Sequence, residues 1–430
     1  MSQSKLHTWA ARRRSEMTGS LWVWPAVASV AAVVLGAAVS KLDVSNVQPL
    51  RPWLYAGDAT DARRLLLSLA TAIVGTLALV IGLTTVAIQV AANRYSPRLL
   101  RSFLRDPAVK VTLSLFIGSF VFNAAGLFTV GQNGPDDYPR LAVTMGIISL
   151  FVCIGALIVF VDRMAHSIQI DTVLARIGES TLRAIERVPP GVGPGCGTVT
   201  LATPQAWAQE LIADRAGYLQ RVRRHELSDI AARGFNVRVA VRVGDHVVPG
   251  VTLGWIWPNT PGSSALVPLD DFRTALWIGQ ERTRNQDMAL GIDQMVDIAL
   301  LSTHVYDFHT VVQATHELTA LLTRLATVDL GDEQQQVGDC TIGLRGRLFA
   351  EYLERACGEL RRRALAEPVI FLAILGMLNR LTIATDHDNV HGPIHEETQL
   401  LLATAERAIS EPAELERITR AAEPMLQFRS

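Results

Sequence analysis

The chain has 430 residues, and its 40 lysines and arginines against 41 acidic residues give a formal net charge of -1. Such a balanced charge excludes the strongly basic footprint of a nucleic-acid-binding protein. The four cysteines lie far apart in sequence without a C-x-x-C pair, so they support neither a zinc motif nor a redox motif. Apolar residues are concentrated before Asp162, which predicts an apolar first part and a more polar second part.

Four apolar runs in the first part are long enough to cross a bilayer, which takes about 20 residues. They are residues 21–40, 65–92, 111–130 and 141–161. A cleaved signal peptide is the alternative for the first run, because small residues end it, although the run is long for that role. The sequence thus predicts a four-helix transmembrane domain over residues 21–162.

Basic residues predict how this domain is oriented. Residues 1–20 and 93–110 are rich in arginine and lysine, whereas 131–140 carries two aspartates and a single arginine. Because basic loops favour the cytoplasmic side, both termini are expected in the cytoplasm of a bacterial cell, with the spans in its inner membrane. The weakest part of this assignment is 41–64, which has mixed charge and should lie outside.

The predicted spans carry few polar side chains and no central Asp, Glu, Lys or Arg, which weakens the case for a proton-coupled transporter. Gln89 and Asn123 are the amides among them. Either residue could line a pore, but an amide in a span more commonly hydrogen-bonds a neighbouring helix.

After the last span, residues 163–195 predict an amphipathic helix followed by a Pro/Gly-rich linker. Residues 196–258 predict a small β-barrel-like module, with strands at 197–201, 208–213, 218–222, 236–243 and 252–257 and a helix at 226–233. Its A-G-Y-L-Q and V-R-V-G-D-H-V-V-P-G segments resemble biotinyl and lipoyl carrier modules, which attach their cofactor to a lysine. No lysine follows Lys110, so a structural or adaptor module is expected and no cofactor is predicted.

Residues 259–430 predict a helical cytoplasmic domain, with helices at 287–301, 307–326, 347–366, 369–385, 394–409 and 412–425. Residues 331–339 are expected to form a polar loop. The apolar helix at 369–385 is expected in a buried core, because Asn379 and Arg380 interrupt it and it is short for a span.

The densest group of metal-ligand side chains consists of Asp386, His387, Asp388, His391, His395 and Glu396. The three histidines are spaced by four residues, which on a helix would place them on one face and could bind zinc. Gly392 and Pro393 are expected to break that helix, so an inter-helix loop is the favoured interpretation. A second group near residues 297–309, which includes His304 and Asp307, has no specific metal motif.

Four stretches resemble the bacterial family of predicted membrane proteins filed as domain of unknown function twenty-two fifty-four. They are QVAANRYSPRLLRSFLRD at 89–106, AGYLQ at 216–220, VRVGDHVVPG at 241–250 and RTRNQDMALGIDQMVDIAL at 282–300. The resemblance implies a membrane location and four N-terminal spans but no activity. The chain departs from it at 300–310, where the family's Ser-Pro and Asn-Asp-Pro segment is replaced by LLSTHVYDFHT.

The sequence therefore predicts a multi-pass membrane protein followed by a cytoplasmic α+β region. No P-loop, G-x-G-x-x-G or G-x-S-x-G motif is present, which disfavours an enzyme. The leading hypothesis is an oligomeric channel-like or regulatory protein with a cytoplasmic sensing domain, and its expected partners are the lipid bilayer and further copies of itself. The alternatives are a membrane-tethered metal-dependent enzyme that uses the 386–396 cluster and a scaffold that recruits cytosolic partners.

Overall fold

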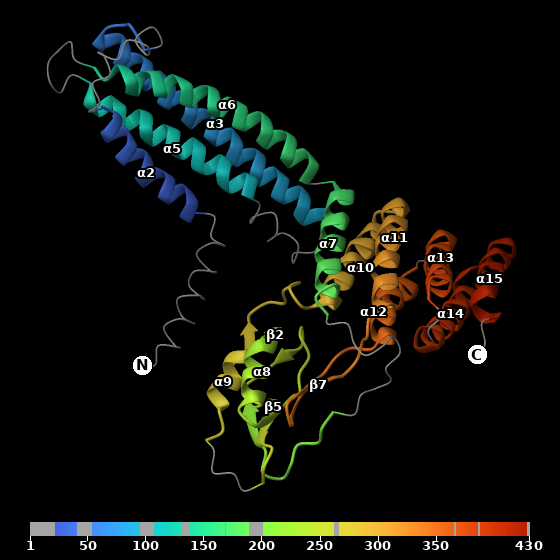
Figure 1. Cartoon of the computed structure of the whole chain (residues 1–430). Helices are drawn as coiled ribbons and strands as arrows, with labels where there is room; N and C mark the ends of the chain where they lie inside the picture. The colour runs from blue at the N-terminus through green and yellow to red at the C-terminus, as the bar shows by residue number, and fades with distance from the viewer. Residues whose placement is uncertain are drawn as a thin grey trace. The chain divides into compact units, whose positions relative to one another are not determined.

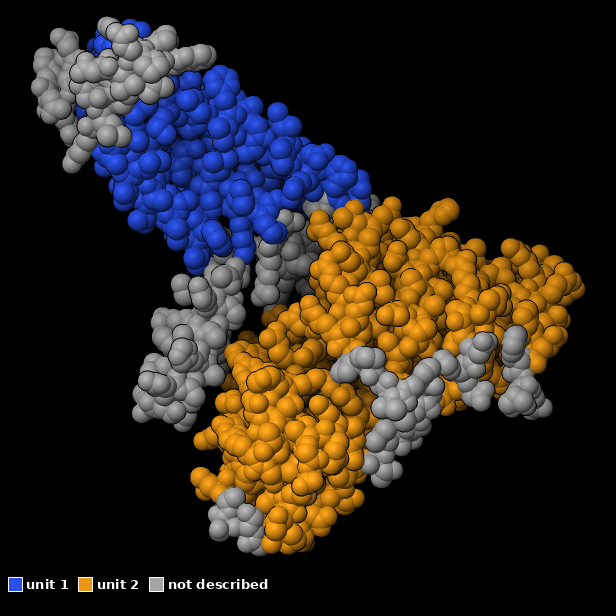
Figure 2. All heavy atoms as spheres, in the orientation of Figure 1, with its two compact units in different colours: residues 1–169 blue, residues 170–430 orange. Residues whose placement is uncertain are grey.

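The computed structural model divides the chain into two compact units, Met1–Gln169 and Ile170–Ser430 (Figures 1 and 2). It describes residues 22–40, 54–94, 107–130, 138–167, 169–188, 201–261, 266–364, 367–385 and 388–427. The predicted strand at 197–201 lies almost entirely outside these ranges. The division between the units falls inside the segment that the sequence assigns to the amphipathic helix and linker.

Within its described residues, the first unit contains four long apolar helices, α2 (Val23–Ser40), α3 (Ala59–Arg94), α5 (Pro107–Thr129) and α6 (Arg140–Ser167). All four are long and apolar enough to cross a membrane, which confirms the number of spans predicted from the sequence. Helix α5 packs against each of the other three (Figure 1).

The helices bury one face in the bundle and expose apolar side chains on the other. Leu66, Ile73, Phe116 and Phe160 are fully buried between the helices. On the outer faces, Val30 of α2 and Phe151 and Ile158 of α6 are each about two-thirds exposed, and many smaller apolar side chains accompany them. Such a surface is unfavourable in water but matches lipid tails.

The second unit contains two open sheets. The larger has the order β1-β5-β3-β8-β7, and the smaller has the order β4-β2-β6. The eight strands are β1 (Gln209–Ile212), β2 (Gly217–Val222), β3 (Phe235–Val239), β4 (His246–Val247), β5 (Thr252–Pro258), β6 (Leu276–Gly279), β7 (Glu333–Val337) and β8 (Cys340–Leu344). All paired strands are antiparallel except β3 and β8, which are parallel.

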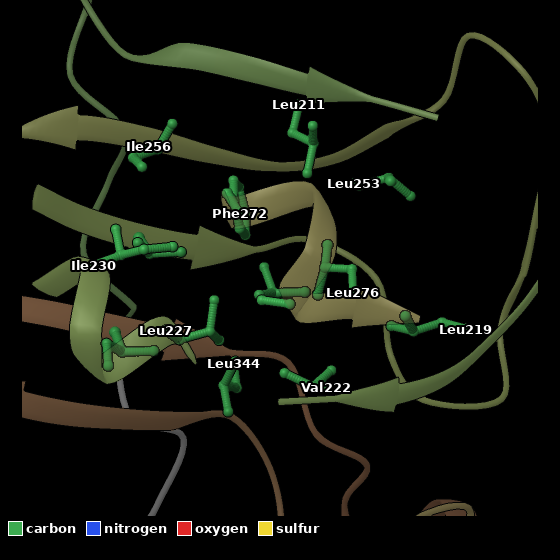
Figure 3. Packing of buried hydrophobic residues seen from close by; sticks show 14 of the residues in the cluster. Leu211, Leu219, Val222, Leu227, Ile230, Leu253, Ile256, Phe272, Leu276 and Leu344 are labelled. Carbon is green, nitrogen blue, oxygen red and sulfur yellow. The ribbon is translucent and has the colours of Figure 1, made fainter. Parts of the chain in front are cut away.

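The short helices α8 (Arg224–Ala232) and α9 (Leu269–Ala275) share one apolar core with both sheets. Leu219 of β2, Leu227 of α8, Ile256 of β5 and Phe272 of α9 are fully buried, and Figure 3 shows these side chains pointing toward one another between the ribbons. Because the core draws from residues 211–344, this region folds as one piece with segments far apart in sequence.

The predicted β-barrel-like module is wrong, because its described strands form two open sheets and no closed barrel. The G-D-x-V-x-x-G segment at 244–250 lies between β3 and β5 and contains β4, which joins the smaller sheet, whereas β3 and β5 pair in the larger one. The larger sheet is then completed by the β7–β8 hairpin, where the sequence predicts a polar loop. Strand β7 has the sequence EQQQV and lies at the sheet edge, so it lacks the apolar alternation that identifies a half-buried strand.

The remaining helices of the second unit are α7 (Ile170–Ile185), α10 (Met288–His304), α11 (Phe308–Leu325), α12 (Phe349–Arg362), α13 (Pro368–Ala384), α14 (Asp388–Ala408) and α15 (Pro412–Gln427). Helix α10 packs against α7, α11 and α12, and α13 packs against α11 and α15. Helix α13 buries Ile370, Phe371 and Ile374 completely or nearly so, which confirms that this apolar helix belongs to a core.

Candidate functional site

Asn123, one of the two amides singled out in the spans, bridges two helices of the first unit. Its side chain is fully buried in α5 and donates hydrogen bonds to the Ser119 carbonyl oxygen at 2.8 Å and to Ser149 Oγ of α6 at 3.2 Å. Gln89 is exposed on α3. The Asn123 contacts are those of a helix-packing amide, and a pore role for either residue stays a prediction.

The histidine cluster is only partly within the described residues. Asp386 and His387 lie outside them, and the Asp388 side chain is likewise not described. His391 and His395 lie one turn apart on α14, and the expected helix break at Gly392 and Pro393 is wrong, because α14 continues through both. A proline this near the start of a helix removes a single backbone hydrogen bond, which packing of the later turns offsets.

His395 is held by neighbours on its own helix and on α15. Its Nε2 lies 2.9 Å from Gln399 Nε2, and its Nδ1 lies 3.5 Å from the Met425 carbonyl oxygen. Within the described residues, no three His, Cys, Asp or Glu side chains are grouped so that they could hold a metal ion. The metal hypothesis for residues 386–395 stays a prediction, because it depends on Asp386 and His387, which lie outside the described residues.

Two residues of the second group of candidate metal ligands, Asp307 and His304, form hydrogen bonds at the ends of helices. Asp307 caps α11, where its carboxylate accepts hydrogen bonds from the Thr310 backbone N–H at 3.2 Å and the Thr310 hydroxyl at 2.7 Å. His304 Nδ1 lies 2.8 Å from the Leu300 carbonyl oxygen in the last turn of α10. These contacts give both residues a structural role.

The most distinctive feature of the second unit is a cleft of about 1130 Å³ that combines arginines with apolar side chains. Its lining comes from the C-terminal end of α7, from β2, α8 and β3, from the 285–288 segment and from residues 329–352. The arginines of this lining are Arg187, Arg221, Arg224, Arg242, Arg345 and Arg347, and its acidic residues are Asp329, Asp332 and Glu333. We call it the arginine cleft.

Three of these arginines are neutralised by carboxylates. Arg224 pairs with Glu333, Arg242 Nη1 lies 2.6 Å from Glu351 Oε2, and Arg347 Nη2 lies 2.8 Å from Asp245 Oδ1. Arg347 also donates to the Val243 carbonyl oxygen at 2.8 Å, which fixes its guanidinium on two sides. These pairs anchor the walls of the cleft.

The other three arginines have spare donors. Within the described part of the chain, neither Arg221 nor Arg345 has an ion pair or a side-chain hydrogen bond, and both are exposed. Arg187 makes a single long contact of 3.5 Å to the Asn285 carbonyl oxygen. Once the three pairs are set aside, Arg187, Arg221 and Arg345 face two further lining acids, Asp329 and Asp332, which leaves one positive charge in excess and unused N–H groups.

A buried ion-pair network supports the cleft from behind. Arg282 donates to both oxygens of Asp287 at 2.7 and 3.0 Å and to Asp293 Oδ2 at 2.7 Å, and Arg355 pairs with Asp293 at 2.8 Å. Asp287 also caps α10 by accepting from the Leu290 N–H. Burial lowers the pKa of Arg282, but the hydrogen bonds and charges of the two aspartates raise it overall, so its charge is secure.

The network joins three of the four stretches that carry the family resemblance. Gly244 packs directly on the Asp287 carboxylate, and it adopts a φ of +92° that favours glycine. The Gly244 N–H donates to the Leu219 carbonyl oxygen at 2.8 Å, and Gln286 Oε1 accepts from the Val222 N–H at 2.9 Å. The segments 216–220, 241–250 and 282–300 thus converge beside the cleft.

Tyr352 of α12 also lines the cleft. Its side chain is buried, and burial raises its pKa to about 12, with nearby charges contributing in both directions. The phenol therefore stays neutral at physiological pH. Tyr352 therefore adds an uncharged side chain to the lining.

Sequence reasoning missed the arginine cleft because no local pattern marks it. Its lining residues are spread from 184 to 352, and the two arginines with free donors lie on β2 and just after β8. The one available signal was the run of arginines in NVRVAVRV and in GLRGR at 343–347, which alone is typical of a solvated strand face.

The four apolar helices, with lipid-compatible outer faces, define the class to which this chain belongs: it is a multi-pass membrane protein with a large α+β unit after its last span. The family model described as predicted membrane protein (DUF2254) matches residues 18–380. The chain belongs to this family, which confirms the resemblance found in its sequence.

Relatives of the chain include two mycobacterial proteins whose descriptions assign no activity. The chain is 32% identical over 411 residues to uncharacterized protein Mb1321c of Mycobacterium bovis and equally to uncharacterized protein Rv1290c of Mycobacterium tuberculosis. Each match covers 93% of this chain and 78% of the relative. No solved structure matches the chain significantly.

Proposed function

We propose that this chain is a membrane-anchored sensor whose second unit binds an anionic ligand in the arginine cleft and thereby regulates the protein. The observation that carries the proposal is the pair of arginines, Arg221 and Arg345, which face the cleft lining without a partner among the described residues. Guanidinium groups with free donors bind carboxylates and phosphates through paired hydrogen bonds, which makes such a cleft an anion site.

The charge pattern of the loops supports an orientation for this sensor. The loop at 93–110 and the N-terminal 20 residues are basic, which favours the cytoplasmic side of a bacterial inner membrane. An even number of spans then puts the second unit in the cytoplasm too, where anionic metabolites are abundant. Homo-oligomer formation, a channel-like role, a scaffold and a metal-dependent enzyme stay predictions from the sequence.

Chain connectivity offers a route from the cleft to the membrane. Ala184, Arg187 and Val188, at and just beyond the C-terminal end of α7, line the cleft. Helix α7 begins only three residues after α6 ends, and α6 is the last apolar helix of the first unit. A ligand that orders the end of α7 would therefore act on the element that continues the last span.

Thermal unfolding of the full-length protein in detergent tests the proposal. Pyrophosphate should raise the melting temperature relative to chloride at equal ionic strength, because a ligand at about a hundred times its Kd stabilises the folded state by about 2.7 kcal/mol. The double variant Arg221→Gln/Arg345→Gln should lose this response. Arg380→Gln is the matched control, because Arg380 is also exposed and without an ion pair among the described residues, but lies on α13 outside the cleft.

The proposal fails if pyrophosphate leaves the melting temperature of the unsubstituted protein unchanged. It also fails if the double variant responds as strongly as Arg380→Gln. Since Arg221 and Arg345 are exposed and unpaired, their substitution should leave the melting temperature without ligand within about 0.5 kcal/mol of stability.

A further inference from the structure

The arginine cleft is only partly cationic, and its remaining lining narrows the class of ligand. Apolar side chains from strands, from the segment after β3 and from the start of α10 share it with the arginines, among them Val222, Val239, Val241, Val243, Met288 and Leu344. Val239, Val222 and Leu344 belong to the buried core, and Val241 and Val243 pack on it while staying half exposed. A small inorganic anion would satisfy the arginines but leave this apolar wall in water.

The volume of the cleft and the charge of its arginines also favour an organic anion as the ligand. A cleft of about 1130 Å³ is slightly larger than the sites of organic ligands, which run from about 300 to 1000 Å³, and so has room for one. Arg187, Arg221 and Arg345 are the cations with spare donors, which suits a ligand with two or more negative charges rather than one.

Acidic residues in the lining add a requirement for a donor on the ligand. Asp329 Oδ1 is buried and has no hydrogen-bond partner among the described residues. Asp332 accepts from the Gly346 N–H at 3.0 Å and Glu333 pairs with Arg224, so among the described residues Asp329 is the one lining acid with a buried, unpartnered oxygen. A buried acceptor without a partner is costly, and a ligand hydroxyl or amino group would satisfy it.

We infer that the arginine cleft binds an organic phosphate with at least two negative charges, its phosphoryl groups at Arg221 and Arg345 and its organic part on Val241, Val243 and Leu344. The inference deepens the proposed function and rests on it. A nucleotide and an anionic phospholipid headgroup both present this chemistry, since each joins phosphoryl oxygens to hydroxyl or amino donors and to an apolar part.

The test compares an inorganic and an organic diphosphate on the full-length protein in phosphatidylcholine nanodiscs. Isothermal titration should give adenosine diphosphate an affinity about tenfold higher than pyrophosphate, because burying apolar surface of the size of one side chain has that effect. Arg221→Gln/Arg345→Gln should weaken both ligands by at least about tenfold, and Arg380→Gln by less than about twofold. Val241→Thr should weaken adenosine diphosphate and leave pyrophosphate unchanged.

A second experiment tests whether the organic phosphate is a lipid headgroup. In nanodiscs that also contain cardiolipin, native mass spectrometry counts the cardiolipin molecules kept by the released protein. Cardiolipin retained by the unsubstituted protein and lost from Arg221→Gln/Arg345→Gln supports the inference with a headgroup as ligand, even where adenosine diphosphate binds no more tightly than pyrophosphate.

The outcomes separate this inference from the function on which it rests. If pyrophosphate binds through Arg221 and Arg345, but adenosine diphosphate binds no more tightly and cardiolipin retention does not depend on these arginines, the organic phosphate is overturned and the anion sensor stands. If none of the three probes depends on Arg221 and Arg345, both proposals are overturned.

Discussion

Substitution of Asp287 is the sharpest test of the ion-pair network that lies beside the cleft. Its side chain is only 1% exposed, and it accepts two charge-assisted hydrogen bonds from Arg282 as well as capping α10. Asp287→Asn keeps an oxygen that can cap the helix, since asparagine is as good an N-cap as aspartate. It removes the negative charge and turns one acceptor of Arg282 into a donor.

The cost follows from these contacts. A hydrogen bond to a charged group contributes about 1.5–3 kcal/mol, and Arg282 keeps Asp293 as a partner, so Asp287→Asn should destabilise the fold by about 2–3 kcal/mol. Asp287→Ala also removes the cap and should cost about 1 kcal/mol more. For a unit of this size, about 2–4 °C in melting temperature corresponds to each kcal/mol, which predicts a fall of about 4–12 °C for Asp287→Asn.

A thiol-reactive fluorophore reports this unfolding directly. Cys340 and Cys357 are buried in the second unit and become reactive when it opens; burial also raises the pKa of both thiols, which suppresses labelling of the folded state. The control is Glu414→Gln, which breaks the exposed pair with Arg417 and should cost less than about 0.5 kcal/mol. A melting temperature for Asp287→Asn equal to that of Glu414→Gln would refute the reasoning.

Three further predictions concern backbone strain, a buried carboxylate and orientation. Gly244→Ala should destabilise the fold by more than Gly234→Ala in the same melting assay: both glycines have a φ near +90°, at a cost of about 1–2 kcal/mol for alanine, but only at Gly244 would the added Cβ collide with Asp287. Equal costs would show that the packing on Asp287 is unimportant. Burial, partly opposed by Arg361, raises the pKa of Glu397 above its ordinary value of 4.5, so the folded state binds that proton more tightly and stability should fall as pH rises from about 4.5 through the raised value. Glu397→Gln should remove this component, and an unchanged pH slope of the melting temperature would contradict it. Green fluorescent protein fused after residue 430 should fluoresce in a bacterial host and alkaline phosphatase fused there should be inactive, whereas the reverse would place the second unit outside the cytoplasm.

Much of the first unit could be predicted from the sequence because a bilayer imposes a simple rule. A lipid-spanning helix must satisfy its backbone internally and present apolar side chains over its length, so run length and hydropathy locate it. The four runs agree with α2, α3, α5 and α6 to within a few residues except at the start of α3 and the end of α6, where the helices extend to Ala59 and Ser167, each six residues beyond the apolar run.

The sheets of the second unit were harder because their signals are tertiary. NVRVAVRV alternates and predicts β3, although the strand ends at Val239. EQQQV does not alternate, because β7 is an edge strand whose one partner among the described strands is β8. The parallel pairing of β3 with β8 joins segments about a hundred residues apart. The prediction of a closed barrel was wrong for the same reason, because the sequence of a strand does not determine which sheet it joins.

The helix through Pro393 and the arginine cleft show a related limit. Local propensity predicts a break at Gly392 and Pro393, but Ile394, Thr398 and Leu401 bury the later turns of α14, and that packing outweighs one lost hydrogen bond. The cleft, likewise, exists only once α7, the sheets and the α10–α12 region fold together.

Equilibrium dialysis of the full-length protein in nanodiscs against radiolabelled pyrophosphate tests the anion site most directly. We predict saturable binding of one pyrophosphate per chain that Arg221→Gln/Arg345→Gln weakens at least about tenfold and Arg380→Gln preserves. Binding that does not saturate, or saturable binding of unchanged affinity in the Arg221→Gln/Arg345→Gln variant, would contradict the assignment of the arginine cleft as the ligand site.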